Sequence, residues 1–96
     1  MPKGYVIARA TVTNPAAWAE YAARAGEAIK KYAGTPIVRG GRCETVEGEG
    51  RARNVVIEFA SYDAALAYAR SPEYAAAKKL RQGAGAIDIV VVEGPA

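Results

Sequence analysis

The sequence predicts one small α+β domain of 96 residues with a ferredoxin-like strand–helix–strand–strand–helix–strand order. Apolar residues alternate at the start of the chain, helix-start signals follow the first and third predicted strands, and two β-branched runs occupy the second half. Two βαβ halves with right-handed crossovers give a four-stranded antiparallel sheet with its helices on one face.

The first half begins with an expected strand over residues 4–13. Its even-numbered positions form one face of small apolar side chains, and its odd-numbered positions form a mixed face. Asn14 and Pro15 then predict a helix start, because asparagine caps helices and proline suits the first helical position. We expect this helix to end near Gly34, as a left-handed stop.

Two strands, over residues 36–47 and 53–59, are expected to pair as a hairpin around a turn at residues 47–51. Ser61 is expected to cap a second helix. Ser71-Pro72-Glu73 repeats the start signal and predicts a break, with a fresh helical segment to about residue 82. A last strand is expected over residues 87–93.

The predicted sheet leaves one face bare of helices. Valine, isoleucine and phenylalanine side chains there would be too apolar to leave in water. A chain of this size buries only about 65% of the surface that its unfolded form exposes. We therefore expect a homodimer in which two such faces meet, because two-fold dimers are the commonest closed assembly.

The charge pattern argues against nucleic acid as a partner. The net charge is +3, with 13 lysines and arginines interspersed among 10 acids. The clearest cationic runs, Lys30-Lys31 and Lys78-Lys79, close the predicted helices, where the helix dipole favours them. No apolar run approaches the ~20 residues of a membrane span, so we expect neither nucleic acid nor a membrane as a partner.

The chain contains no histidine and one cysteine, Cys43. These counts exclude a Ser-His-Asp or Cys-His nucleophile, a credible structural zinc site and haem held by a proximal histidine. No glycine-rich phosphate motif follows a strand. We therefore expect no metal and no cofactor. Because no internal disulfide can form and no signal peptide is evident, we expect a cytoplasmic protein.

Charged residues inside the predicted strands are the first candidates for a site. Glu58 lies between Ile57 and Phe59, where a carboxylate needs a partner or a raised pKa. The assumed hairpin turn sets Glu58 opposite Gly40 and Ile57 opposite Gly41, which would leave space for a ligand above the sheet. A plain β-bulge at the glycines is the alternative interpretation.

Arg39 and Arg53 are the arginines expected to hold an anionic oxygen. Tyr74, just inside the helix break, is the tyrosine expected at a cleft between helix and sheet. The alternative for Tyr74 is core packing with its hydroxyl at the rim.

The chain resembles the domain-of-unknown-function 1330 family over nearly its whole length. The motifs that carry the resemblance are the Val38-Arg39-Gly40-Gly41 strand, the strand at residues 53–59, and Ser71-Pro72-Glu73-Tyr74. The resemblance implies a dimeric α/β barrel, as in a superfamily that includes small cofactor-free monooxygenases, muconolactone isomerases and haem enzymes. It implies no particular reaction. Its motif positions correspond here to Arg39, Gly40, Gly41, Arg53, Asn54, Glu58, Ser71 and Tyr74.

Three hypotheses follow for an uncharacterised protein. In the first, a metal-free, cofactor-free enzyme acts on a small aromatic or carboxylated molecule in a sheet–helix cleft. Glu58 would be its acid or base and Tyr74 its oxyanion donor, with Arg39, Arg53, Gly40, Gly41, Asn54 and Ser71 binding the substrate. In the second, the same residues bind a small anion without turnover. In the third, Arg39, Arg53 and Glu58 form only an interchain ion-pair network in a structural homodimer.

Overall fold

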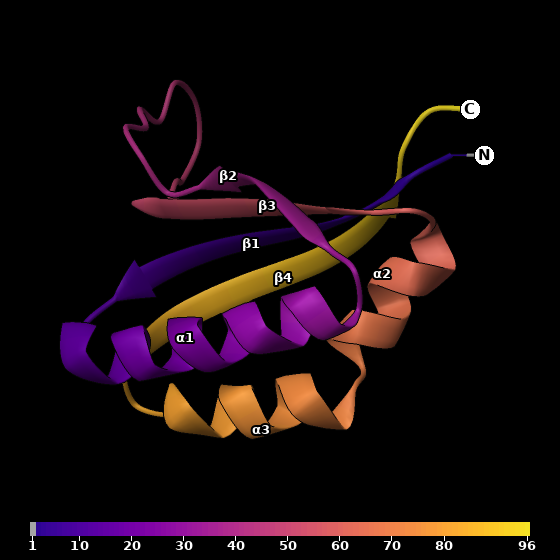
Figure 1. Ribbon diagram of the computed structural model, residues 1–96. Helices are drawn as coiled ribbons and strands as arrows, with labels where there is room; N and C mark the ends of the chain where they lie inside the picture. The colour runs from indigo at the N-terminus through magenta and orange to yellow at the C-terminus, as the bar shows by residue number, and fades with distance from the viewer. Residues whose placement is uncertain (1) are drawn as a thin grey trace.

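The computed structural model describes residues 2–96 and confirms the predicted element order. Figure 1 shows the strands as one layer and the helices as a second layer on one side of it. In chain order the elements are β1 (Gly4–Val12), α1 (Pro15–Lys31), β2 (Thr35–Arg39), β3 (Arg53–Phe59), α2 (Tyr62–Ala69), α3 (Pro72–Leu80) and β4 (Gly85–Glu93).

The four strands form one antiparallel sheet in the order β2-β3-β1-β4. Because side chains alternate along a strand, β1 sends Val6 and Ala10 toward the helices, where they are 2% and 3% exposed. Tyr5, Ile7 and Arg9 point the other way. We call the sheet face that carries these three residues the outer face, and the helices cover the inner face.

The start of α1 follows the predicted capping chemistry. The Asn14 side-chain oxygen accepts a hydrogen bond from the Ala17 N–H at 3.2 Å, and Pro15 takes the first helical position. Its end differs from the prediction, because Ala33, with φ of 59°, is the left-handed residue rather than Gly34. Gly34 is needed for another reason: a Cβ there would lie 2.7 Å from the Phe59 ring.

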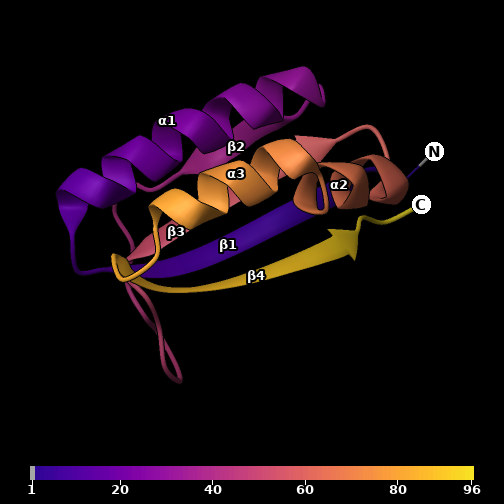
Figure 2. The ribbon, with the colours of Figure 1, turned by 90° about the horizontal axis from the view of Figure 1, so that it is seen from below.

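Two serine caps divide the second helical region as predicted. The Ser61 hydroxyl accepts from the Ala64 N–H at 3.1 Å and opens α2. The Ser71 hydroxyl accepts from the Tyr74 N–H at 3.0 Å and donates to the Tyr68 carbonyl at 2.7 Å. The second serine therefore joins the end of α2 to the start of α3. Figure 2, seen from the helix side, shows α1 and α3 lying side by side across the sheet.

The predicted hairpin register is wrong. Strand β2 ends at Arg39, and Gly40 and Gly41 follow with φ of 76° and 93°, a left-handed conformation that takes the chain out of the strand. The partner of Glu58 is Thr35 rather than Gly40, and the partner of Ile57 is Pro36 rather than Gly41. A register irregularity does occur, between Pro36 and Val38.

Residues 40–52 form a loop instead of the expected strand and turn. Figure 1 shows this loop projecting from the sheet on the side away from the helices. Its base is tied to the outer face, because the Arg51 guanidinium donates to Asp88 at 2.9 Å and to Thr11 at 3.0 Å.

The core lies between the inner face and the three helices. Phe59, 1% exposed, stacks on Tyr68 with ring centroids 5.3 Å apart. Ala65 on α2 and Ala77 on α3 are fully buried. None of the helices described by the structure is long and apolar enough to cross a membrane.

Candidate functional site

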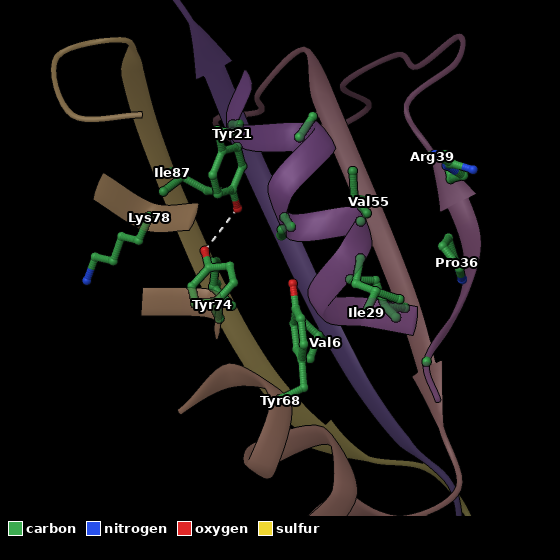
Figure 3. Close-up of a pocket in the computed structure, with 18 of the residues that line it drawn as sticks. Val6, Tyr21, Ile29, Pro36, Arg39, Val55, Tyr68, Tyr74, Lys78 and Ile87 are labelled. Carbon is green, nitrogen blue, oxygen red and sulfur yellow. Dashed lines mark hydrogen bonds between the residues drawn. The ribbon is translucent and has the colours of Figure 1, made fainter. Parts of the chain in front are cut away.

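A cavity of about 740 Å³ lies between the inner face and the helices. This volume is within the range typical of small-molecule sites. Its floor is formed by small and branched apolar side chains of β1, β3 and β4: Val6, Ala8, Ala10, Val55, Ile57, Ile87 and Ile89. Figure 3 shows several of these side chains together with the tyrosines that extend from the helices. The alternation of the predicted strands is therefore what builds the floor.

Two buried tyrosines meet inside the cavity. The hydroxyl oxygens of Tyr21, on α1, and Tyr74, on α3, lie 2.9 Å apart, and their rings meet edge to face (Figure 3). Tyr21 belongs to the buried stripe of α1, and the Ser71 cap sets Tyr74 in the first turn of α3. Each hydroxyl carries one proton, and the shared hydrogen bond uses one of the two. Within residues 2–96 neither hydroxyl has another partner, so one O–H donor is left for a ligand.

Two of the cavity tyrosines, Tyr21 and Tyr68, are donors rather than bases. Burial, together with the neighbouring Tyr74, raises the pKa of Tyr21 far above its usual value. Burial likewise raises the pKa of Tyr68, whose hydroxyl also points into the cavity (Figure 3). Both phenols therefore remain protonated at neutral pH and can donate to an oxygen atom.

The cavity has a strong excess of cationic side chains around it. Five line it: Lys30, Arg39, Arg53, Lys78 and Arg81. Glu27 is the one acid among the lining residues. The three ion pairs found within residues 2–96 join Lys3 to Glu58, Lys31 to Glu73 and Arg51 to Asp88, so none of them uses a cavity cation.

Arg81 is the most constrained of the five cations. Its guanidinium carbon lies 5.4 Å from the centre of the Tyr21 ring, in cation–π contact. Its Nε is buried and has no hydrogen-bond partner within the described chain. A buried donor without an acceptor calls for an explanation, and an anionic ligand in this cavity would supply one.

Arg53 and Gly40 lie close together, a contact that the sequence analysis did not predict. A Cβ on Gly40 would lie 2.9 Å from the Arg53 Nη1, so the glycine lets the guanidinium pack against the chain. Arg39 also reaches the cavity, at the end of β2 (Figure 3). A Cβ on Gly41 would meet nothing within 4 Å, and Asn54 faces away, donating to the Arg51 carbonyl at 3.1 Å. Neither Gly41 nor Asn54 lines the cavity.

Glu58 does not lie in the cleft between sheet and helices. It is paired with Tyr5 across the sheet and shares the outer face with it. The Tyr5 hydroxyl donates to the Glu58 carboxylate at 3.3 Å, and the Lys3 ammonium lies 3.6 Å from it. Because Ile57 and Phe59 point inward, alternation sends Glu58 outward. The expectation that Glu58 and Tyr74 act on one substrate in this cleft is therefore corrected.

Ser71 is buried but its hydroxyl is already used on both sides by the helix junction. It does not line the cavity, and it sets the position of Tyr74. Of the eight site residues expected from the sequence, the structure thus brings Arg39, Arg53 and Tyr74 to the cavity, with Gly40 supporting Arg53.

The outer face carries an apolar row across all four strands. Direct cross-strand neighbours place Val38 beside Val56, Val56 beside Ile7 and Ile7 beside Val90. Val38 and Val90 are 42% and 54% exposed. Polar groups flank the row, with Glu58 toward one end of the strands and Arg9 toward the other. The bare apolar face predicted from the sequence is therefore present, but without phenylalanine, because the one phenylalanine of the chain, Phe59, points toward the helices.

Comparison with known proteins decides the family. The family model described as domain of unknown function DUF1330 matches residues 3–95. The chain belongs to this family. No curated protein matches the sequence.

Solved structures share the fold of this DUF1330 chain. A protein of unknown function from Rhodopseudomonas palustris is similar with a TM-score of 0.78 at 17% identity, over 99% of this chain and 84% of its own. SnoaB, a cofactor-independent oxygenase from Streptomyces nogalater, is similar with a TM-score of 0.61 at 12% identity, over 100% and 96% of the two chains. A dimeric protein of unknown function with a ferredoxin-like fold, from Bacteroides fragilis, has a TM-score of 0.53 at 19% identity, over 95% of each chain.

Sequence reasoning missed three cavity residues of this DUF1330 protein. Tyr21, Tyr68 and Arg81 line the cavity but were not among the site residues expected from the sequence. The signal for Tyr21 was its place on the same α1 stripe as Trp18 and Ala25. No local pattern shows that Arg81 lies over the Tyr21 ring, because that contact depends on how α1 and α3 pack.

Proposed function

We propose that the helix–sheet cavity binds a small aromatic or carboxylated anion and that the protein is an enzyme working without metal or cofactor. The observation that carries this proposal is the set of five cavity cations, none of which has an acidic partner within residues 2–96. Protein cations without partners around an apolar cavity favour a ligand that brings the negative charge itself.

The tyrosine pair supplies the chemistry in this proposal. Its free O–H would donate to an oxygen on which negative charge develops, such as an enolate or phenolate oxygen. Arg39 and Arg53 would hold a carboxylate of the same molecule. The shared fold with a cofactor-independent oxygenase supports chemistry of this class, although it carries no residue roles over.

A second candidate, binding without turnover, is favoured by one observation. Among residues 2–96, Glu27 is the acid that lines the cavity, and it is an exposed residue on α1. With Glu58 on the outer face, no buried carboxylate remains there to act as a general base. A substrate that is already ionised would need no general base, and neither would a carrier function.

Incubation with a panel of aromatic acids and phenols, in air, tests the two candidates. Ligand binding would be followed by calorimetry and turnover by mass spectrometry of the products. The enzyme proposal expects Tyr74→Phe to remove turnover while a carboxylate ligand still binds. Tyr62→Phe, a matched change at an exposed tyrosine outside the cavity, should change neither. Binding by the wild type with no product from any compound would support the carrier function instead.

We further propose that the outer faces of two copies meet in a homodimer. The apolar row from Val38 to Val90 supports this, as does a solved structure with the same fold that is described as dimeric. The exposed, unpaired Cys43 thiol supports a cytoplasmic location. Sedimentation should give a dimer for the wild type and a monomer for Val56→Lys, at the centre of the row. A monomeric wild type at micromolar concentration would contradict the proposal.

A further inference from the structure

Four of the five cavity cations fall into two groups on opposite sides of α1, and the fifth, Lys30, lies on α1 itself. Arg39 and Arg53 come from β2 and β3, at one edge of the sheet, whereas Lys78 and Arg81 come from α3 and its C-terminal cap. Figure 3 shows Arg39 and Lys78 at opposite ends of the lining, with Tyr21 and Val6 between them. The positive charge around the site is therefore divided between two ends.

Arg39 and Lys78 mark the two ends of the cavity lining (Figure 3). Arg39 is on β2, at the edge of the sheet opposite β4, and three strand spacings of about 4.8 Å separate these two edges. The Arg81 guanidinium is held on the α3 side by its contact with the Tyr21 ring. A molecule that contacts both groups must carry an anionic oxygen at each end.

The space between the two groups is apolar. It is floored by Ala8, Val55 and Ile57 and closed by the Tyr21–Tyr74 pair. Such a lining favours an aromatic or aliphatic body that buries its surface there. At the α3 end, the unpartnered Arg81 Nε provides half of the fork that receives a carboxylate through two parallel hydrogen bonds.

We propose that the substrate is a molecule with two anionic groups at opposite ends of an apolar, ring-sized body. This inference rests on the proposed function, since it concerns the same cavity. It assigns Arg81 to one end and Arg39 with Arg53 to the other, and the free tyrosine O–H to an oxygen carried between them.

Calorimetry with four probes tests the proposal: 2-naphthoate, benzoate, terephthalate and phthalate. Terephthalate and phthalate have the same formula and charge, but only terephthalate carries its carboxylates at opposite ends of the ring. We expect terephthalate to bind about tenfold more tightly than benzoate, because a second charge-assisted hydrogen-bonded pair forms. Phthalate should bind no more than about threefold more tightly than benzoate, since both its charges reach one end. Equal affinities for terephthalate and phthalate would overturn the inference.

The outcomes separate this inference from the proposed function. If 2-naphthoate or benzoate binds and terephthalate binds no more tightly, the proposed anion-binding cavity is supported. The proposal of a substrate with an anionic group at each end is then overturned. Failure of all four probes to bind would overturn both.

Single variants locate the two ends. Arg81→Gln and Arg39→Gln should each lower terephthalate affinity to about that of benzoate, roughly tenfold, because one carboxylate loses its partner. Benzoate should lose no more than about a factor of two in either variant, since the other end remains. Arg24→Gln, the same charge change at an exposed α1 residue outside the cavity, is the control and should alter neither affinity. If Arg81→Gln matched this control, the α3 end of the site would be refuted.

Discussion

The hydroxyl oxygens of Tyr21 and Tyr74 lie 2.9 Å apart and join α1 to α3 across 53 residues of sequence. The contact is buried, and each ring packs edge to face on the other. It fixes the spacing of the two helices that wall the cavity, and it leaves one proton of the pair directed to no protein acceptor within residues 2–96. Structure and proposed chemistry therefore depend on the same pair.

Removing either hydroxyl should destabilise the fold measurably. Tyr21→Phe and Tyr74→Phe should each lower the free energy of unfolding by about 1–2 kcal/mol, because the remaining hydroxyl loses its buried partner. The double variant should lose less than the sum of the two single variants, since the second change removes an already orphaned group. Urea unfolding of the four proteins gives this cycle, and strict additivity would show that the hydrogen bond contributes nothing.

Lys31 and Tyr32, at the end of α1, both donate to the Glu73 carboxylate at the start of α3. This contact predicts that the stability of the fold depends on pH. Hydrogen bonds from Lys31 and then Tyr32 lower the pKa of Glu73 to about 2, from an ordinary value of 4.5. A carboxyl whose folded-state pKa is depressed stabilises the fold above its unfolded pKa and loses that contribution as the pH falls through the folded pKa. Glu73→Gln should therefore be less stable than the wild type at pH 7, with the difference vanishing as the pH approaches 2.

Thermal unfolding between pH 2 and pH 7 checks this prediction. Glu20→Gln, at an exposed α1 glutamate without a hydrogen bond or ion pair within residues 2–96, is the control. Because the Lys31–Glu73 ion pair is exposed, 1 M salt should reduce the difference in stability between Glu73→Gln and the wild type. A difference that persisted unchanged at pH 2 would contradict the assigned cause.

Phe59 anchors the layer between sheet and helices. It is 1% exposed and stacks on Tyr68. Its ring occupies the space where a side chain at position 34 would lie. Phe59→Ala should cost about 3–5 kcal/mol, through lost burial and the cavity left behind. Val46→Ala, at a side chain that is 92% exposed, should change stability by less than about 0.5 kcal/mol. Comparable losses in the two variants would show that the core is assigned wrongly.

The two faces of β3 should behave differently toward ligands. Arg53 lines the cavity and Glu58 pairs with Lys3 on the outer face. Arg53→Gln should weaken binding of terephthalate about tenfold, by loss of a charge-assisted hydrogen bond. Glu58→Gln should leave the affinity within about a factor of two. A large loss of affinity in Glu58→Gln would show that the Glu58 carboxylate takes part in ligand binding, contrary to this account.

Local sequence signals predicted most of the fold. The Asn14, Ser61 and Ser71 caps bond as their positions indicate, and the helix break at residues 71–73 is present. The alternation of β1 separated its two faces as predicted, and the face of small apolar side chains is the inner one. These features depend on neighbours within a few residues, where propensity and periodicity carry the information.

The β2–β3 pairing depended on a turn that does not form. Two consecutive glycines with positive φ end β2, and the chain then leaves the sheet until Arg53. The wrong register also placed Glu58 opposite the glycines, although alternation with Ile57 and Phe59 already sent it outward. Since a pairing register rests on long-range contacts, the strand pattern alone could not fix it.

The cavity itself was only partly accessible to sequence reasoning. Arg39, Arg53 and Tyr74 were chosen because charge in a strand and a tyrosine at a helix break are informative locally. The meeting of Tyr21 with Tyr74, and of Arg81 with the Tyr21 ring, depends on the packing of α1 against α3. Packing of that kind leaves no short motif.

The measurement that tests the central claim most directly is a methyl NMR titration of isoleucine- and valine-labelled protein with 2-naphthoate. The inner face carries Val55, Ile57, Ile87 and Ile89, and the outer face carries Ile7, Val56 and Val90. If the cavity is the anion site, the methyl signals of the inner set shift with ligand and those of the outer set stay in place. Shifts confined to the outer set, or no shifts at millimolar ligand, would contradict the account.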